Sequence, residues 1–280
     1  MRNLTLIALI GLGACADKDA TDDSSHSDDS GATEQDVAVT FAARFGATPA
    51  ACGQEIPGVG TTGSTISLQD LRFYVHDLRL VDSAGAEVPV TLDDDDLWQN
   101  GTVALLDFED ATGLCGNGTS PTNDTVTGVA PAGDYTGLRF TLGVPFGLNH
   151  ADAAVADTPL NLSTMFWSWQ SGYKFLRMDL STAGLPEGWF VHLGSTGCTA
   201  DPDGTVTDCT EPNRVEVALD MDVDTQVVVA DFGALLAGSD VDADGGGAQG
   251  CMSGLSDPEC GPVLGAFGLS GGPQVLFSAE

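Results

Sequence analysis

Apolar residues recur at every second position in several stretches of this 280-residue chain. In residues 214–221 the apolar side chains of Val215, Val217 and Leu219 alternate with polar neighbours such as Glu216, and residues 37–45 and 138–144 follow the same pattern. A period of two is typical of half-buried β-strands, and the 36 glycines and 13 prolines supply turns between short strands. The sequence predicts an all-β fold, an antiparallel β-sandwich with long disulfide-stapled loops and one or two short helices, near residues 163–170 and 232–236.

The charge of the chain excludes several classes of partner. Lysine and arginine number 9 against 41 aspartates and glutamates, so the formal net charge is −32. Nucleic acid and anionic membrane surfaces are bound through basic side chains, which are too few here. Disorder throughout is also excluded, because 42% of the residues are hydrophobic.

The first residues indicate export. Residues 1–14 combine a basic start with a short apolar run, which is typical of a signal peptide. The run Leu12-Gly13-Ala14-Cys15 resembles a bacterial lipobox, in which Cys15 becomes the lipidated N-terminus; the alternative is an ordinary signal peptide with an incidental cysteine. Ala16 at the next position favours the outer membrane, on its periplasmic or cell-surface side. Residues 15–36 are acidic and almost without apolar side chains, so we expect a disordered tether before a single domain at 37–280.

Six cysteines remain in the domain, and an even number in an exported chain favours disulfides. Two pairs are close enough in sequence to staple local loops, which leaves a third, long-range bridge. The predicted pairs are Cys198–Cys209, Cys251–Cys260 and Cys52–Cys115. A thiolate metal site is the rival reading, although the chain contains no C-x-x-C motif.

Motifs of the common catalytic classes are missing from the sequence. It contains no G-x-S-x-G, Walker A, G-x-G-x-x-G or H-E-x-x-H pattern, so we predict that the protein is not an enzyme. The acidic run 93–96 is typical of a solvated loop. Residues 240–245 match the opening of a calcium loop, with Cys251 where a bidentate glutamate should stand. Calcium is therefore kept only as an alternative cofactor.

The domain holds three histidines, His76, His150 and His192, each on or just after a predicted strand. A buried histidine is usually a hydrogen-bonded core residue. Three in one exported domain can instead converge, and imidazole is the commonest ligand of transition metals in proteins. We therefore predict that the three bind one transition-metal ion.

Four motifs resemble one family. They are Phe-Tyr-Val-His-Asp-Leu-Arg-Leu at 73–80, Gly-Val-Pro-Phe-Gly-Leu-Asn-His-Ala-Asp at 143–152, Met-Phe-Trp-Ser-Trp-Gln-Ser-Gly-Tyr-Lys-Phe at 165–175 and His-Leu-Gly-Ser-Thr-Gly-Cys at 192–198. Together they resemble the MbnP-like copper-binding proteins, also described as four-cysteine proteins of the metallo-mystery pair system. The resemblance spans most of residues 37–280, but this domain has six cysteines, so which four correspond to the family pattern stays open.

The resemblance implies a copper-binding lipoprotein that is partner and substrate of a di-haem enzyme of the MauG and cytochrome c peroxidase type. That enzyme would oxidise a tryptophan at the copper site to kynurenine, and the candidates are Trp167, Trp169 and Trp189. Their ordinary role would be core packing. The alternative function is a surface adhesive or carbohydrate-binding β-module, with tryptophans that stack on sugars and Asp loops that bind calcium.

Overall fold

A computed structural model describes residues 33–168 and 170–280, which form one compact unit from Thr33 to Glu280. The proposed signal peptide, Cys15 and most of the proposed tether lie outside the described residues. Among the residues described, no helix is long and apolar enough to cross a membrane.

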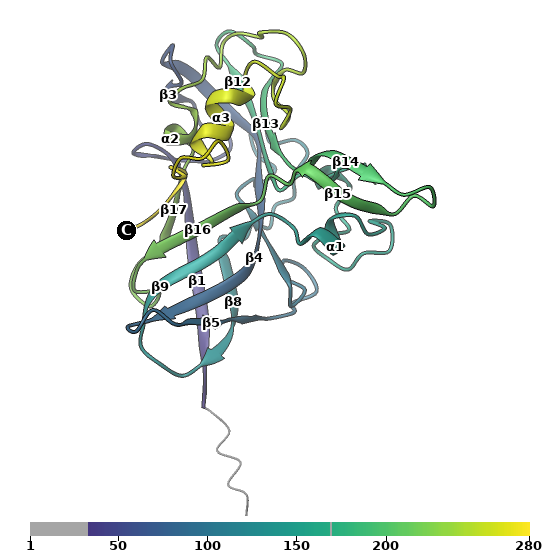
Figure 1. The fold of residues 1–280 in the computed structure, drawn as a ribbon. Helices are drawn as coiled ribbons and strands as arrows, with labels where there is room; N and C mark the ends of the chain where they lie inside the picture. The colour runs from purple at the N-terminus through teal and green to yellow at the C-terminus, as the bar shows by residue number, and fades with distance from the viewer. Residues whose placement is uncertain (1–32, 169) are drawn as a thin grey trace, which may run out of the picture. The chain divides into compact units, whose positions relative to one another are not determined.

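Two sheets dominate this unit (Figure 1). The first has nine strands: β3 (Ile56–Val59), β4 (Ser64–Asp82), β5 (Glu87–Pro89), β7 (Val103–Asp107), β9 (Tyr135–Leu142), β12 (Leu176–Thr182), β13 (Trp189–Leu193), β16 (Val215–Asp220) and β18 (Gly250–Cys251). The second has six: β1 (Glu34–Phe45), β2 (Thr48–Pro49), β6 (Thr91–Leu92), β8 (Thr125–Pro131), β17 (Val228–Asp231) and β19 (Phe277–Ala279).

Two ribbons and a few short helices complete the described residues. The ribbons are β10 (Phe166–Ser168) with β11 (Gly172–Tyr173), and β14 (Thr196–Ala200) with β15 (Val206–Glu211). The helices are α1 (Phe146–Asn149), α2 (Phe232–Leu236), α3 (Cys260–Ala266) and a 3-10 turn, η1 (Ser163–Met165). Figure 1 shows β14, β15 and α1 side by side as an arm on one side of this unit.

The mostly-β prediction is confirmed, but the two sheets do not make a plain antiparallel sandwich. The long strand β4 pairs with β12 through its first half and with β9 through its second, so the nine-stranded sheet curls. The change falls between Phe73 and Val75, and a register shift in the β4–β9 pairing follows His76, where Asp77 has a φ of 53°. An extra residue of this kind bends a strand and increases its twist. Two pairs, β1 with β17 and β13 with β18, are parallel.

Aromatic side chains fill the space between the sheets. The ring of Phe41 on β1 lies 6.1 Å from that of Phe73 on β4 and 5.6 Å from that of Phe140 on β9, measured between centroids. Phe277 on β19 lies 5.1 Å from Phe140. Each of these side chains is at least 95% buried, so the odd-numbered residues of β4 around Phe73 point into the core.

Three local predictions need correction. The strand β1 begins at Glu34, so residues 34–36 are not tether; they pair with β8 through backbone hydrogen bonds that do not need apolar side chains. The helix expected at 163–170 is only the turn η1, because the chain then extends into β10. The helix at 232–236 is present as α2, capped by the Asp231 carboxylate, whereas α3 was not predicted.

Three disulfides cross-link the unit, in the pairing that the sequence predicted. Cys52–Cys115 joins positions 63 residues apart, and Cys198–Cys209 and Cys251–Cys260 close short loops. Disulfides of this number are typical of exported proteins.

Candidate metal centre

The face of the nine-stranded sheet that points away from the aromatic core carries charged residues. Arg72 on β4, Arg177 on β12 and His192 on β13 are aligned across three neighbouring strands. Asp70 and Asp179 form the next aligned pair. Directly paired residues share a face of a sheet, so these five side chains form one buried polar cluster.

His192 is oriented by a carboxylate. Its Nε2 atom lies 2.6 Å from Oδ1 of Asp179, and its side chain is almost fully buried. Burial lowers the pKa of His192, although the contact with Asp179 raises it. The neutral ring therefore donates from Nε2 to Asp179 and carries its lone pair on Nδ1, a buried atom without a hydrogen-bond partner among the described residues.

Asp179 is itself held in place. Burial raises the pKa of its carboxyl group, but the hydrogen bonds from His192 and Arg177 outweigh burial and lower it. The Nε and Nη2 atoms of Arg177 donate to Asp179 at 2.9 and 2.6 Å, and Nη1 of Arg177 lies 3.0 Å from Asp70. Arg72 donates from Nε and Nη2 to the two carboxylate oxygens of Asp70. The carboxylate beside His192 is thus fixed by a chain of buried ion pairs.

Trp167 lies beside the same histidine. Its ring centroid is 6.1 Å from that of His192, and the side chain is half-buried on β10. Gly194, just after β13, provides the space: a Cβ atom there would lie 2.8 Å from Cζ3 of the Trp167 ring. The contact between the indole and His192 therefore depends on a glycine at this position.

The other tryptophan candidates differ in position. Trp189 is fully buried on β13, three residues before His192, and so lies on the opposite face of the strand. It lines a separate cavity of ≈190 Å³ with Ser239 and Glu259. Trp169 lies outside the described residues. A buried Trp189 cannot stack on a sugar, which removes one support for the carbohydrate-binding alternative.

His76 lies elsewhere on the sheet. It is on β4, four residues beyond Arg72, and its Nδ1 atom contacts the carbonyl oxygen of Gly143 at 2.9 Å. Four residues along a strand and two strand spacings across place its Cα roughly 16 Å from that of His192. Among the described residues, the rings of His76 and His192 are not part of one close group of ligand atoms.

His150 belongs to a third location, at the end of α1. Its Nε2 atom lies 3.6 Å from Sγ of Cys209 and 3.1 Å from Nδ2 of Asn149, and its ring packs against Phe146 at 4.7 Å between centroids. His150, Cys198 and Cys209 offer ligand atoms within 4.8 Å of one another. The two sulfur atoms are joined as a disulfide, so they are not thiolates in this state.

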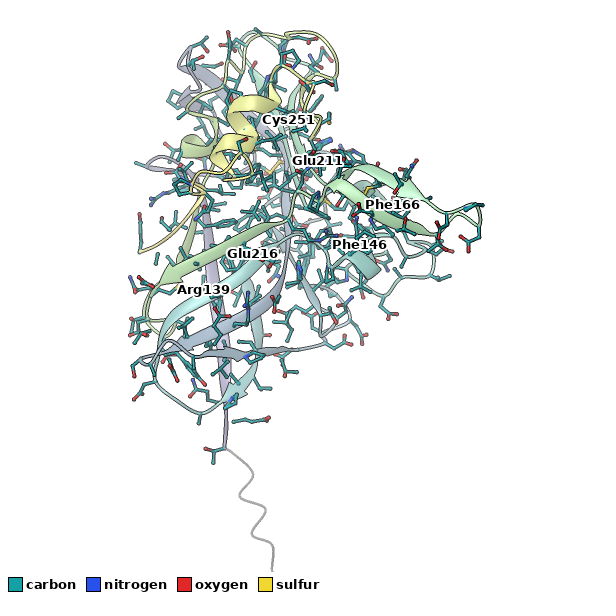
Figure 2. The ribbon with its side chains drawn as sticks, in the orientation of Figure 1. Arg139, Phe146, Phe166, Glu211, Glu216 and Cys251 are labelled. Atoms are coloured by element: carbon teal, nitrogen blue, oxygen red, sulfur yellow. A yellow bond between two sulfur atoms is a disulfide. The ribbon has the colours of Figure 1, made fainter. Side chains whose placement is uncertain are left out.

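The strand β10 separates this group from the cluster around His192. Phe166 lines a cleft of ≈540 Å³ together with His150, whereas Trp167 faces His192. Successive residues of a strand point to opposite sides. Figure 2 labels Phe146 and Phe166, which lie in the arm with β14 and β15. Among the described residues the ring nitrogens of the three histidines do not come together in one ligand group, so their convergence on one copper ion stays a prediction.

The acidic loops have structural roles. Asp242 accepts hydrogen bonds from Thr62, Ser64 and the backbone of Gly184. Within the described part of the chain, Asp240, Asp242 and Asp244 do not gather their carboxylates around one point. In the run 93–96, Asp95 caps a turn by accepting from three backbone N–H groups. Neither loop supports the calcium alternative.

Sequence reasoning missed Asp179, Arg177 and Gly194. A signal for the first two was present, because Arg177 and Asp179 occupy alternate positions in an otherwise apolar strand. Charged side chains on one face of a buried strand must pair with one another. The role of Gly194 depends on where Trp167 packs, and no local pattern contains that information.

Fold and site together define a class: a disulfide-linked β-protein with a carboxylate-oriented histidine beside a tryptophan on one face of a curled sheet. The family model described as MbnP matches residues 34–253. A solved structure, MbnP from Methylosinus trichosporium, is similar at 33% sequence identity and a TM-score of 0.75, covering 89% of this chain and 99% of that one. The chain belongs to the MbnP family. No curated protein sequence matches it.

Proposed function

We propose that this protein binds copper at His192, and that Trp167 is oxidised to kynurenine to complete the site. The observation that carries the proposal is the pairing of His192 with Asp179, which leaves the buried Nδ1 atom of His192 without a hydrogen-bond partner among the described residues. Histidines that bind metals usually donate their second nitrogen to a carboxylate or a carbonyl, which fixes the ring and raises its basicity. The donor set fits copper, for which neutral imidazole is a good ligand.

The position of Trp167 suits this chemistry. Kynurenine carries an aryl amine and a ketone in place of the indole ring, with a net gain of one oxygen and loss of one carbon. The ring beside His192 would then present nitrogen and oxygen donors where the indole presents an apolar face. Of the candidate tryptophans that the structure describes, Trp167 alone adjoins the polar cluster, so it is preferred to Trp189.

The proposed partner is a di-haem oxidase of the MauG and cytochrome c peroxidase type. A chain of net charge −32 attracts a partner that presents a basic docking face. Such attraction accelerates encounter and weakens as salt is added, because charges more than about 8–10 Å apart are screened at physiological ionic strength. The protein catalyses nothing in this scheme; it is a substrate for modification and then a copper carrier.

We also propose export and anchoring at the outer membrane through a lipid on Cys15. The three disulfides support an oxidising compartment. Labelling with a radioactive fatty acid tests the anchor: label should enter the parent and be lost in Cys15→Ala. Label retained by Cys15→Ala would contradict it.

The central experiment is co-expression with and without an active di-haem partner, followed by peptide mass spectrometry and metal analysis. Kynurenine should appear at Trp167 only with the partner, and bound copper should rise with it. His192→Ala should lose the copper. Trp98→Phe is the matched control, because Trp98 packs against the core and is distant in sequence from Trp167. This variant should keep both the kynurenine at Trp167 and the bound copper. Unmodified Trp167 together with full copper binding would contradict the proposal.

A further inference from the structure

A second group of metal-ligand atoms lies in the arm, apart from the cluster around His192. It comprises His150 at the end of α1 and the disulfide that joins Cys198 on β14 to Cys209 on β15. The ligand atoms lie within 4.8 Å of one another, which is within the reach of one ion. In the oxidised protein the group offers one imidazole and no thiolate.

The Cys198–Cys209 bridge is the most accessible of the three disulfides. Cys198 is half-buried, while the other five bridged cysteines are buried. A reductant must reach a sulfur atom in order to attack it, so exposure selects which bridge opens first. Both other bridges are protected at each end by the core.

The Nε2 atom of His150 lies close to these sulfur atoms. The amide nitrogen of Asn149 contacts Nε2 at 3.1 Å, and an amide NH₂ group can only donate. Nε2 therefore accepts, and the same atom lies 3.6 Å from Sγ of Cys209. Clefts of ≈540 and ≈420 Å³ both include His150 in their walls, so a small ion can reach its imidazole.

The cysteines stay close to each other when the bridge opens. Cys198 and Cys209 are directly opposed in the β14–β15 ribbon, whose pairing extends from Thr196–Glu211 to Ala200–Val206. The carbonyl of Cys198 also accepts a hydrogen bond from Gln170 at 2.8 Å. Backbone pairing therefore keeps the two sulfur atoms near His150 without the covalent bond.

We propose that the Cys198–Cys209 disulfide is a redox gate, and that its reduction creates a Cu(I) site from the two thiolates and His150. A dithiol reductant supplies two electrons and two protons: the S–S bond breaks, two thiols form, and the reductant becomes a disulfide. Binding of Cu(I) then displaces the two thiol protons. The site carries two negative charges from sulfur and one positive charge from copper.

The donor set selects the ion. Thiolates are soft ligands that favour Cu(I), and imidazole completes a three-coordinate arrangement. A structural zinc site usually requires four protein ligands, whereas this group supplies three. The inference does not depend on the site at His192, because Trp167 and Phe166 place the two groups on opposite sides of β10.

The test uses the full chain with His192→Ala, so that the proposed first site does not contribute. The protein is treated with dithiothreitol without oxygen, and the reductant is then removed. Opened cysteines are mapped by alkylation in one sample, and a second sample is left unalkylated for the copper titration. Cu(I) is then titrated against a chromophoric chelator. We expect one additional Cu(I) per chain in the reduced protein and none in the oxidised protein. The alkylated peptides should be those of Cys198 and Cys209.

Two sets of variants make the result decisive. Cys198→Ser with Cys209→Ser should abolish the additional copper, and His150→Ala should weaken it at least tenfold. His76→Ala is the matched histidine control and should leave it unchanged. Equal copper binding before and after reduction, retention of the copper by the double serine variant, or prior opening of Cys251–Cys260 would each overturn the proposal. Circular dichroism of each variant separates loss of ligand from loss of fold.

Discussion

The Nε2 atom of His192 donates to Oδ1 of Asp179 across two neighbouring strands, at 2.6 Å. The two residues are not directly opposed, since Asp179 pairs with Phe190 and His192 with Arg177. A diagonal contact of this kind is possible only if Asp179 leans along its strand, and Arg177 holds it there. The orientation of the histidine ring is thus determined by β12 rather than by its own strand.

Replacing Asp179 with asparagine should weaken copper binding without removing a ligand. The amide keeps the shape of the carboxylate but raises the basicity of the ring less than a carboxylate does, and loss of such a partner typically costs 10–100-fold in metal affinity. Competition with a Cu(I) chelator measures the change. Asp220→Asn, at an exposed position on β16, is the control and should bind like the parent. Equal affinities in the two variants would contradict a positioning role for Asp179.

Replacing Gly194 with alanine should displace Trp167 from His192. The added Cβ would lie 2.7 Å from the carbonyl oxygen of Tyr173 and 2.8 Å from the indole ring. Overpacking of this kind costs about 1–3 kcal/mol in stability, and the yield of kynurenine at Trp167 should fall. Gly147→Ala is the matched control, because nothing lies within 4 Å of its Cβ position. Thermal unfolding and peptide mass spectrometry measure both effects.

The fold class could be read from the sequence because half-buried strands leave a local pattern. Val215, Val217 and Leu219 alternate with exposed neighbours on β16, as the period of two predicts. The cysteine pairing was also predictable, since two pairs are close in sequence and only one pairing remains. The predicted start of β1 lies three residues after the observed one, because polar residues such as Asp36 can also pair through their backbone with β8.

The site could be predicted only in part. His192 was a candidate because the domain holds few histidines, and Trp167 was a candidate from a resemblance. Their proximity depends on how β10 packs against the end of β13. The relative positions of the three histidines could not be predicted for the same reason. His76 and His192 lie on separate strands of one sheet, and strand order is a long-range property that spacing along the chain does not encode.

The buried carboxylates should differ sharply in their importance for stability. Asp70 is fully buried and contacts both Arg72 and Arg177, so Asp70→Asn leaves two guanidinium groups without their shared anion. Removing one partner from a buried ion pair typically costs about 3–5 kcal/mol. Glu109 lies 3.6 Å from Arg72, and burial raises its pKa, so the neutral variant Glu109→Gln should be tolerated. Urea unfolding measures the loss of stability in each variant. A larger loss in Glu109→Gln than in Asp70→Asn would refute the prediction.

The last prediction concerns acid and the histidine that takes no part in either proposed site. Burial lowers the pKa of His76 below its ordinary value of 6.5, an effect that the nearby Arg214 reinforces, while the carbonyl of Gly143 and Asp77 oppose it. Below about pH 6.5 the unfolded chain therefore takes up a proton at this position that the folded protein does not. Proton uptake favours the unfolded state, so stability should fall as the pH falls through this window.

His76→Gln removes that dependence while keeping an amide that can donate to Gly143. The variant should therefore lose less stability than the parent as the pH falls from 7 to 5. One proton contributes at most about 1.4 kcal/mol per pH unit to the slope. Urea unfolding of the copper-free protein at a series of pH values measures this slope. The free energies of unfolding of the parent and His76→Gln should differ in their pH dependence mainly below pH 6.5. Parallel plots of free energy against pH over the whole range would show that His76 titrates alike in the folded and unfolded states.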